Sequence, residues 1–175
     1  EADRLELAPI ATNIHDILEQ VCDITKYQAS QKSLELLLNI DPHTPQFILI
    51  DPIRIKQVLI NLISNAIKFT EEGEVEVSVK YNENIQHTNG DKKIGNLIFS
   101  IRDTGIGISQ EDQKRLFKAF SQADSATTRR FGGTGLGLVI SSKIIEKMDS
   151  KIELKSSVGK GSTFHFSITT QIFPD

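Results

Sequence analysis

Several residue types are scarce in this 175-residue chain, and each scarcity excludes a class of protein. The chain has one cysteine, Cys22, which excludes an internal disulfide or a metal site of several thiolates and is typical of a reducing compartment. No apolar run is long enough to span a membrane, and no stretch has the features of a signal peptide. We therefore expect a cytoplasmic domain. The chain begins at Glu1 and not at methionine, so we expect a piece of a longer protein.

An excess of charge of one sign is also lacking. The chain has 20 lysines and arginines against 23 aspartates and glutamates, a formal net charge of -3. Without a basic field or a basic amphipathic stretch, we expect neither a nucleic-acid partner nor membrane contact. The hydrophobic content of 38% and charged content of 25% are typical of a globular domain, and the length allows one domain with a substantial core.

The clearest helical pattern covers residues 51–70. Its single proline, Pro52, stands near the start, where a helix tolerates it. Apolar residues at steps of three and four predict a buried face: Ile55, Leu59, Leu62, Ala66 and Phe69. Polar residues at the same steps form one stripe: Arg54, Gln57, Asn61, Asn65 and Lys68. Buried amides need partners, so this stripe is either a solvated surface or the floor of a ligand site.

The remaining pattern predicts helices interleaved with strands. Residues 1–12 have the features of an incoming linker with a short extended segment, and Asn13 is a candidate N-cap for a helix that buries Ile24 and the apolar residues before it. We expect strands over 34–40, 47–50, 74–81 and 96–102, the first of them an apolar and therefore buried strand, and helices over 113–120 and 136–148. A hairpin is expected over 151–170. We therefore predict that residues 13–175 form one α+β two-layer sandwich, with a mixed, largely antiparallel sheet and helices on one face.

A turn with two glycines follows the strand expected over 96–102, and it allows three interpretations. Its residues are Asp103, Thr104, Gly105, Ile106, Gly107 and Ile108. Aspartic proteases use an Asp-Thr-Gly sequence, but two such carboxylates share a proton, so this single copy would require a homodimer. The segment could also be a simple tight turn. In the third interpretation, Asp103 accepts hydrogen bonds from a buried amine, such as the exocyclic amine of a purine, and the glycines let the backbone approach closely.

A second glycine-rich segment, residues 132–137, precedes a predicted helix. Free N–H groups at a helix start can bind an anion. The spacing is not that of a Rossmann motif, which needs glycine where Leu138 stands, and a P-loop lysine is missing. Arg129 and Arg130 just upstream either contact phosphate or form a solvated basic pair. The four histidines are scattered without metal-ligand spacing, and no serine lies in a nucleophile elbow.

The amide-lined helix, the Asp-x-Gly-x-Gly turn and the glycine-rich segment together resemble the catalytic ATP-binding domain of sensor histidine kinases. That domain belongs to the GHKL ATPase superfamily, which includes DNA gyrase, heat-shock chaperone ATPases and mismatch-repair proteins. By this resemblance, residues 51–70 are the N box, 103–108 the G1 box, 116–120 the F box and 133–138 the G2 box. The run FSQADSATTRRFGGTGLGL is especially similar to kinases of the hybrid type. The resemblance implies the Bergerat ATP-binding fold.

The resemblance also implies the ligands, ATP and Mg²⁺, and the residues that bind them. Asn65 is the implied Mg²⁺ ligand, Asp103 receives the adenine amine, and Thr163 makes a second contact through water. Phe117 and Phe120 anchor a lid over residues 121–132. The implied catalytic residues are Asn61, Lys68 and Arg129. The implied nucleotide-binding residues are Asn61, Asn65, Lys68, Phe69, Asp103, Gly105, Gly107, Ile108, Phe120, Arg130, Gly133, Thr134, Gly135, Leu136, Gly137 and Thr163.

Residue 61 separates the branches of the superfamily that the chain resembles. Hydrolytic members carry a glutamate where Asn61 stands, and an amide cannot accept a proton from water in that way. The resemblance therefore implies transfer of the ATP γ-phosphoryl group to a histidine, with slow hydrolysis. None of the histidines here has the Thr-Pro setting of the family's acceptor, so we expect the acceptor on a dimerisation domain of the same polypeptide. A response regulator receiver domain is the implied indirect partner. We expect the fragment to be monomeric, and the cytoplasmic part of a sensor that is itself membrane-bound or soluble.

One departure from the family pattern lies after the last predicted helix. Similar kinases often have two glycines after the helix methionine, where this chain has Asp149 and Ser150 after Met148. Aspartate tolerates a left-handed backbone better than most residues. We expect a local change in the turn and an intact site.

Overall fold

The computed structural model describes residues 5–83, 87–121 and 134–174. Within them, eight strands form one sheet in the order β1-β3-β8-β6-β4-β2, with β5 paired to β6 and β7 paired to β8. The strands are β1 (Ile10–Asn13), β2 (Glu35–Ile40), β3 (Phe47–Ile50), β4 (Glu74–Tyr81), β5 (His87–Asn89), β6 (Lys92–Asp103), β7 (Glu153–Ser157) and β8 (Gly161–Phe173). Among these pairs, β2 and β4 are parallel and the others antiparallel.

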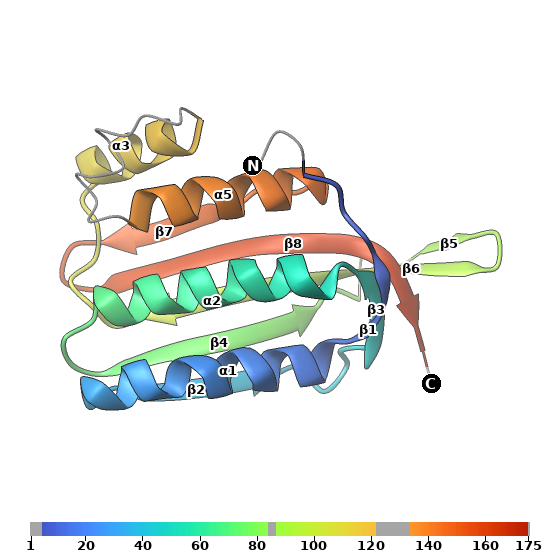
Figure 1. Cartoon of the computed structure of the whole chain (residues 1–175), viewed down its shortest axis with the longest axis horizontal. Coiled ribbons are helices and arrows are strands. Elements are labelled where there is room, and N and C mark those ends of the chain that lie inside the picture. The colour runs from blue at the N-terminus through green and yellow to red at the C-terminus, as the bar shows by residue number, and fades with distance from the viewer. Residues whose placement is uncertain (1–4, 84–86, 122–133, 175) are drawn as a thin grey trace.

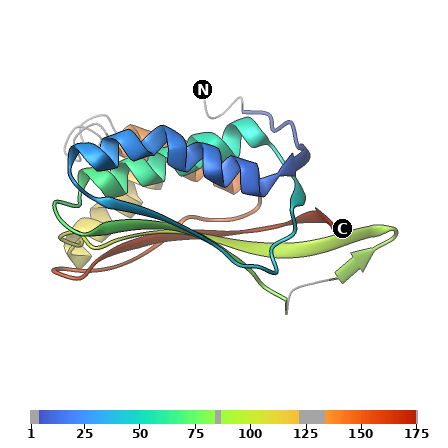
Figure 2. The same cartoon turned by 90° about the horizontal axis from the view of Figure 1, so that it is seen from below.

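The helices form a second layer on one face of this sheet. They are α1 (Ile14–Gln31), α2 (Pro52–Lys68), α3 (Gln110–Ser121) and α5 (Thr134–Lys147). In Figure 1, α1, α2 and α5 run along the sheet, and α3 lies beyond the end of α5. In Figure 2, α1, α2 and α5 all lie on the same side of the sheet. The predicted two-layer sandwich with a mixed, largely antiparallel sheet is confirmed.

The hydrophobic core lies between the sheet and the helices, and it buries one face of the helices and of the central strands. Inward side chains of β4, β6 and β8 alternate with outward ones, and Phe99 stacks on Phe166 with ring centroids 5.2 Å apart. The predicted apolar face of α2 is buried at Ile55, Leu59, Leu62 and Ala66. None of the described helices is long and apolar enough to cross a membrane.

Two details of the core differ from the sequence prediction. Ile24 is 55% exposed, and Thr25 takes its place at 1% exposure, donating from Oγ1 to the Val21 carbonyl over 2.7 Å. At 100° per residue, position 25 lies almost in line with Ile14, whereas position 24 points well away from it. The strand expected to be buried over 34–40 is β2, which lies at the sheet edge and alternates between exposed and half-buried residues.

The turns around the two layers also follow local sequence signals. The extended segment expected within residues 1–12 is β1, which pairs with β3 and extends to Asn13. Asn13 caps α1 as predicted, accepting from the Asp16 N–H. Asp149 has a φ of 59°, so it takes the left-handed conformation expected where similar kinases have glycine.

Asp51 fixes the start of α2 and also holds the incoming chain. Its Oδ1 accepts from the N–H groups of Ile53 and Arg54, each over 3.1 Å, and its Oδ2 accepts from the Ala8 N–H over 2.9 Å. Removing a capping side chain costs about 0.5–2 kcal/mol. We expect Asp51→Ala to lower the melting temperature by about 2–4 °C for each kcal/mol lost, as measured by thermal unfolding. Asp51→Asn keeps a capping oxygen and should lose clearly less; an equal loss would contradict the capping role.

Candidate functional site

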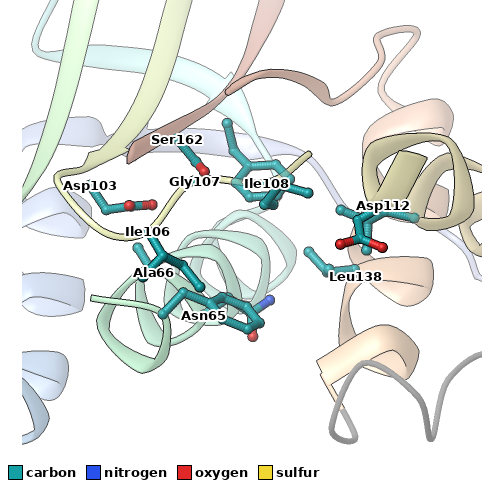
Figure 3. Close-up of a pocket in the computed structure, with 12 residues that line it drawn as sticks. Asn65, Ala66, Asp103, Ile106, Gly107, Ile108, Asp112, Leu138 and Ser162 are labelled. Atoms are coloured by element: carbon teal, nitrogen blue, oxygen red, sulfur yellow. The ribbon is translucent and has the colours of Figure 1, made fainter. Parts of the chain in front are cut away.

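A cavity of about 150 Å³ opens between the C-terminal part of α2, the loop after β6 and the helices α3 and α5 (Figure 3). Its lining is mostly apolar, with a few polar groups from separate elements. The lining residues are Asn65, Ala66, Phe69, Asp103, Ile106, Gly107, Ile108, Asp112, Leu116, Leu138, Ser162 and Phe164. A concave apolar site with a few placed polar groups is what a small-molecule ligand requires.

Asp103 is the buried charge of this cavity. It ends β6 and is 5% exposed. Burial raises the pKa of the Asp103 carboxyl above its usual range, against opposing hydrogen bonds from the N–H groups of Gly105 and Ser162 and from the Thr70 hydroxyl. The Gly105 N–H lies 2.8 Å from Oδ1. A desolvated carboxylate on an apolar wall is a strong acceptor for a ligand donor.

The two glycines of the 103–108 loop are required by close backbone approach. A Cβ at Gly105 would lie 2.4 Å from the Phe69 carbonyl oxygen. Gly107 has a φ of +76°, and a Cβ there would lie 2.0 Å from the Ser157 carbonyl oxygen. Any larger residue would push the loop away from α2 or from the turn after β7, and the cavity wall would shift with it.

Asn65 presents a buried amide to the cavity. The residue is 4% exposed, and its Nδ2 has no hydrogen-bond partner among the described residues. Leaving a buried donor unsatisfied costs about 1–3 kcal/mol. An unpaired amide at a cavity wall therefore fits a ligand that supplies oxygen atoms.

Asn61 lies one turn earlier on α2 and faces α5. Its Nδ2 donates to Ser141 Oγ over 3.1 Å, and a Cβ at Gly137 would lie 2.4 Å from Asn61 Oδ1. Gly137 therefore lets the start of α5 pass directly over this amide. Asn61 is not one of the residues that line the cavity. It contacts α5, and Leu138 of the same helix lines the cavity.

The end of α2 carries Lys68 and Phe69. Phe69 is the C-cap and lines the cavity, whereas Lys68 is exposed and lines an adjoining groove. That groove also contains Lys32, and Asn65 lines both the groove and the cavity. Lys32 Nζ donates to the carbonyls of Ile67 and Lys68 over 2.9 and 3.1 Å, so a positive charge caps this helix end. At the start of the polar stripe, Arg54 Nη1 donates to Gln57 Oε1 over 3.1 Å on the surface.

Thr163 does not reach the cavity. Along β8, residues 162, 164 and 166 are buried toward the helices, and Thr163 points to the opposite face because side chains alternate. Its neighbour Ser162, 6% exposed, lines the cavity beside Asp103. The pairing of Asp103 with Ser162 in the β6–β8 register explains this placement.

Several predicted site residues belong to the segment between α3 and α5 or to the adjoining helix ends. Arg129, Arg130 and Gly133 lie outside the described residues, as does most of the predicted lid. Phe117 and Phe120 belong to α3, and Thr134, Gly135 and Leu136 belong to the first turn of α5.

Seven cavity residues were not among the predicted site residues: Ala66, Ile106, Asp112, Leu116, Leu138, Ser162 and Phe164. The alternation along 162–170 could have found Ser162 and Phe164. Nothing in the local sequence distinguished Asp112 from other charged residues at a helix start.

Comparisons with known proteins agree with this geometry. Residues 50–172 match the family model "Histidine kinase-, DNA gyrase B-, and HSP90-like ATPase". The signal transduction histidine-protein kinase BarA of Escherichia coli is 41% identical over the whole chain, and the sensor histidine kinase GacS of Pseudomonas protegens is 44% identical over 96% of it. The chain spans only 18% of the length of each of these relatives.

Solved structures give the same result. The full-length ShkA structure in complex with AMPPNP is similar over 98% of this chain and 33% of its own, with a TM-score of 0.79 and 29% identity. A nucleotide-free catalytic domain of the histidine kinase ThkA covers 95% of this chain and 97% of its own, with a TM-score of 0.68 and 26% identity. The chain therefore belongs to the family of histidine kinase-, DNA gyrase B- and HSP90-like ATPases, and within that family it is an ATP-binding catalytic domain of the histidine kinase type.

Proposed function

We propose that this domain binds Mg-ATP in the cavity and transfers the γ-phosphoryl group to a histidine on a dimerisation domain outside this chain. The observation that carries this proposal is that one apolar cavity holds both a buried carboxylate, Asp103, and a buried amide, Asn65, whose Nδ2 has no hydrogen-bond partner among the described residues. The first suits the amine of adenine, and the second suits the oxygen-rich end of a nucleotide.

The adenine end is assigned to Asp103 and its neighbours. The carboxylate accepts the exocyclic amine, and apolar side chains such as Ala66, Leu138 and Phe164 cover the faces of the ring. Ser162 replaces Thr163 as the second polar contact, because Ser162 lines the cavity. Gly105 and Gly107 let the backbone follow the ring closely.

The phosphate end is assigned to α2 and the start of α5. Asn65 fits a Mg²⁺ ion because that ion takes oxygen ligands and keeps several waters, so one amide oxygen with phosphate oxygens is adequate. The metal would neutralise charge on the phosphates there. We assign two further groups to the phosphates: the charge of Lys68 at the end of α2, and the backbone N–H groups at the start of α5 near Gly135 and Gly137. Arg129, Arg130, Gly133, Thr134 and Leu136 stay predicted contacts.

Asn61 favours phosphoryl transfer over hydrolysis. Its amide donates to Ser141 and cannot take a proton from an attacking water. In the proposed transfer, a histidine nitrogen attacks the γ-phosphorus, the bond to the β–γ bridging oxygen breaks, and ADP leaves. The protein mainly positions the groups and screens charge.

The partners follow from the same assignment. The relatives are much longer than this chain, and one of them is named a hybrid signal transduction histidine kinase in Dictyostelium discoideum, 40% identical over 94% of this chain and 8% of its own length. We infer that a dimerisation and phosphoacceptor domain of the same polypeptide is the direct substrate, and that a receiver domain is an indirect partner. A cytoplasmic position within a sensor of this kind is part of the proposal.

The direct test supplies γ-labelled ATP and Mg²⁺ to this domain together with a separate dimerisation domain that carries the acceptor histidine. We expect label on that histidine and slow release of free phosphate. The Asn61→Glu variant places a base at this position and should raise phosphate release relative to transfer. Rapid phosphate release by the native domain without labelling of the acceptor would instead indicate a hydrolytic ATPase, and binding without either reaction would indicate a non-catalytic nucleotide-binding module.

The raised pKa of Asp103 predicts how ATP affinity responds to pH. The ionised carboxyl is the better acceptor, and burial raises its pKa in the free domain, so affinity should fall on acidification at a higher pH than for an ordinary aspartate. The stability of the unliganded domain responds with the opposite sign. The contribution of the Asp103 carboxyl to the free energy of unfolding is fully present below the ordinary aspartate pKa. It is lost as pH rises through the raised pKa of the folded domain.

Titrations of ATP into the native domain and into Asp103→Asn at each pH provide the measurement. The phosphates of ATP titrate equally in both experiments, so the ratio of the two affinities isolates Asp103. A ratio that stays constant down to the ordinary aspartate range would contradict the prediction.

A further inference from the structure

Ser156 on β7 has a hydroxyl with three hydrogen-bond partners. The Ile108 N–H donates to Ser156 Oγ over 2.7 Å, Ser156 Oγ donates to the Gly161 carbonyl over 3.0 Å, and Ser162 Oγ lies 2.7 Å away. A serine hydroxyl has one proton and two lone pairs. Its proton is used by the Gly161 carbonyl, which can only accept, and one lone pair is used by Ile108.

The remaining lone pair of Ser156 determines the direction of the Ser162 hydroxyl. Either oxygen could be the donor in this contact. We assign the Ser156 proton to the Gly161 carbonyl, which can only accept, so that Ser162 donates to Ser156. Ser162 lines the cavity beside Asp103, so its oxygen offers only lone pairs to a ligand (Figure 3). The part of the wall formed by β6 and β8 therefore presents two buried acceptors: the Asp103 carboxylate and the Ser162 oxygen.

We propose that Ser156 is a specificity-determining positioning residue, which makes the cavity select adenine over 6-oxopurines. The inference rests on the proposed function. The exocyclic amine of adenine has two N–H donors for a wall of acceptors. Hypoxanthine and guanine carry a carbonyl oxygen at the same position, and an acceptor facing acceptors leaves buried polar groups unpaired. Ser156 does not touch the base; it acts through the direction of the Ser162 hydroxyl.

Gln113 on α3 connects the same two segments through their backbone carbonyls and not through the Ser156 or Ser162 hydroxyl. Its Nε2 donates to the carbonyls of Ile108 and Ser156 over 2.7 and 3.1 Å. The Gly159 N–H also donates to the Ile106 carbonyl over 2.7 Å. Gln113→Ala therefore loosens the wall without freeing the Ser162 proton, which makes it a matched control.

The test measures the affinities of the native domain, Ser156→Ala and Gln113→Ala for ATP and inosine triphosphate by calorimetric titration. Removing the Ser156 hydroxyl frees Ser162 to donate into the cavity. We expect Ser156→Ala to weaken ATP and to keep or strengthen inosine triphosphate, which narrows the preference for ATP about tenfold, equivalent to about 1.4 kcal/mol. Gln113→Ala should weaken both nucleotides by a similar factor, and Ser156→Thr should keep the native preference because it restores the hydroxyl.

Equal weakening of both nucleotides in Ser156→Ala would overturn the inference and leave Ser156 a merely structural role. If Ser156→Ala does not fold in thermal unfolding, Ser162→Ala decides: it should weaken ATP and leave inosine triphosphate unchanged, and an equal loss of both overturns the inference. Failure of the native domain to bind ATP would contradict the proposed function itself, which keeps the two failures distinct.

Discussion

Replacing Asp103 by asparagine is expected to lower the affinity of the domain for ATP about 10- to 150-fold. Hydrogen bonds to charged groups contribute about 1.5–3 kcal/mol, and the buried carboxylate is the charged acceptor of the cavity wall. An amide also turns an N–H group toward the adenine amine in one of its two orientations. Calorimetric titration of a non-hydrolysable ATP analogue into both proteins measures the change.

The unliganded fold should survive this substitution. Burial opposes ionisation of Asp103, so a neutral amide removes a desolvation cost, and the melting temperature near neutral pH should not fall. Asp112→Asn is the matched control because it makes the same change at a side chain that is 51% exposed and pairs with Arg115. We expect it to change the affinity several-fold less. Equal effects of the two variants would contradict the assignment of adenine to Asp103, and unchanged ATP affinity in Asp103→Asn would reopen the other interpretations of the Asp-Thr-Gly turn.

Replacing Asn65 by alanine is expected to remove most of the Mg²⁺-dependent part of ATP binding. Loss of even an outer partner of a metal ligand costs about 10- to 100-fold in metal affinity, and a direct ligand should cost no less. Transfer to the acceptor histidine should fall further, about 100- to 1000-fold, because charge on the phosphates is no longer neutralised in the transition state. Titration of the ATP analogue with and without Mg²⁺ separates the two contributions.

The stability of the Asn65→Ala domain provides an independent readout. The Asn65 Nδ2 is buried without a partner among the described residues, so its removal should leave the melting temperature of the unliganded domain unchanged or raised. Gln57→Ala also removes a side-chain amide from the same helix stripe, but at a surface position that contacts Arg54, and it should leave nucleotide binding intact. If Mg²⁺ strengthens binding equally in the native domain and in Asn65→Ala, then Asn65 is not the metal ligand.

Local sequence determined the elements of this domain well. The alternation over 74–81 and the three- and four-residue steps over 51–70 predicted β4 and α2 almost to the residue, because each pattern reflects burial of one face. Cap signals were equally local, as Asn13 and Asp51 show. The identity of the site was also predicted from sequence, because the glycines and Asp103 occur in a specific order.

Which residues of the α2 polar stripe face the cavity depends on tertiary contacts. The stripe of α2 is polar throughout, yet its members differ in their contacts. Arg54 and Gln57 pair on the surface, Asn61 donates to Ser141, and the buried Nδ2 of Asn65 has no partner within the part of the chain that the structure describes. The partner of Asn61 comes from α5, a segment some 80 residues away along the chain, so local sequence could not identify it.

The register between β6 and β8 explains which hydroxyl residue of β8 faces the cavity. Thr163 and Ser162 are both short hydroxyl residues, and only the pairing of β8 with β6 turns Ser162 toward Asp103. A shift of one residue moves a side chain to the opposite face of a sheet, so local chemistry alone cannot choose between them. The Ser162 hydroxyl also contacts Ser156, which pairs with it across the β7–β8 hairpin and is distant from Asp103 in sequence. Local patterns were therefore enough to predict the fold class and the family, whereas long-range strand and helix pairing determined which side chains line the cavity.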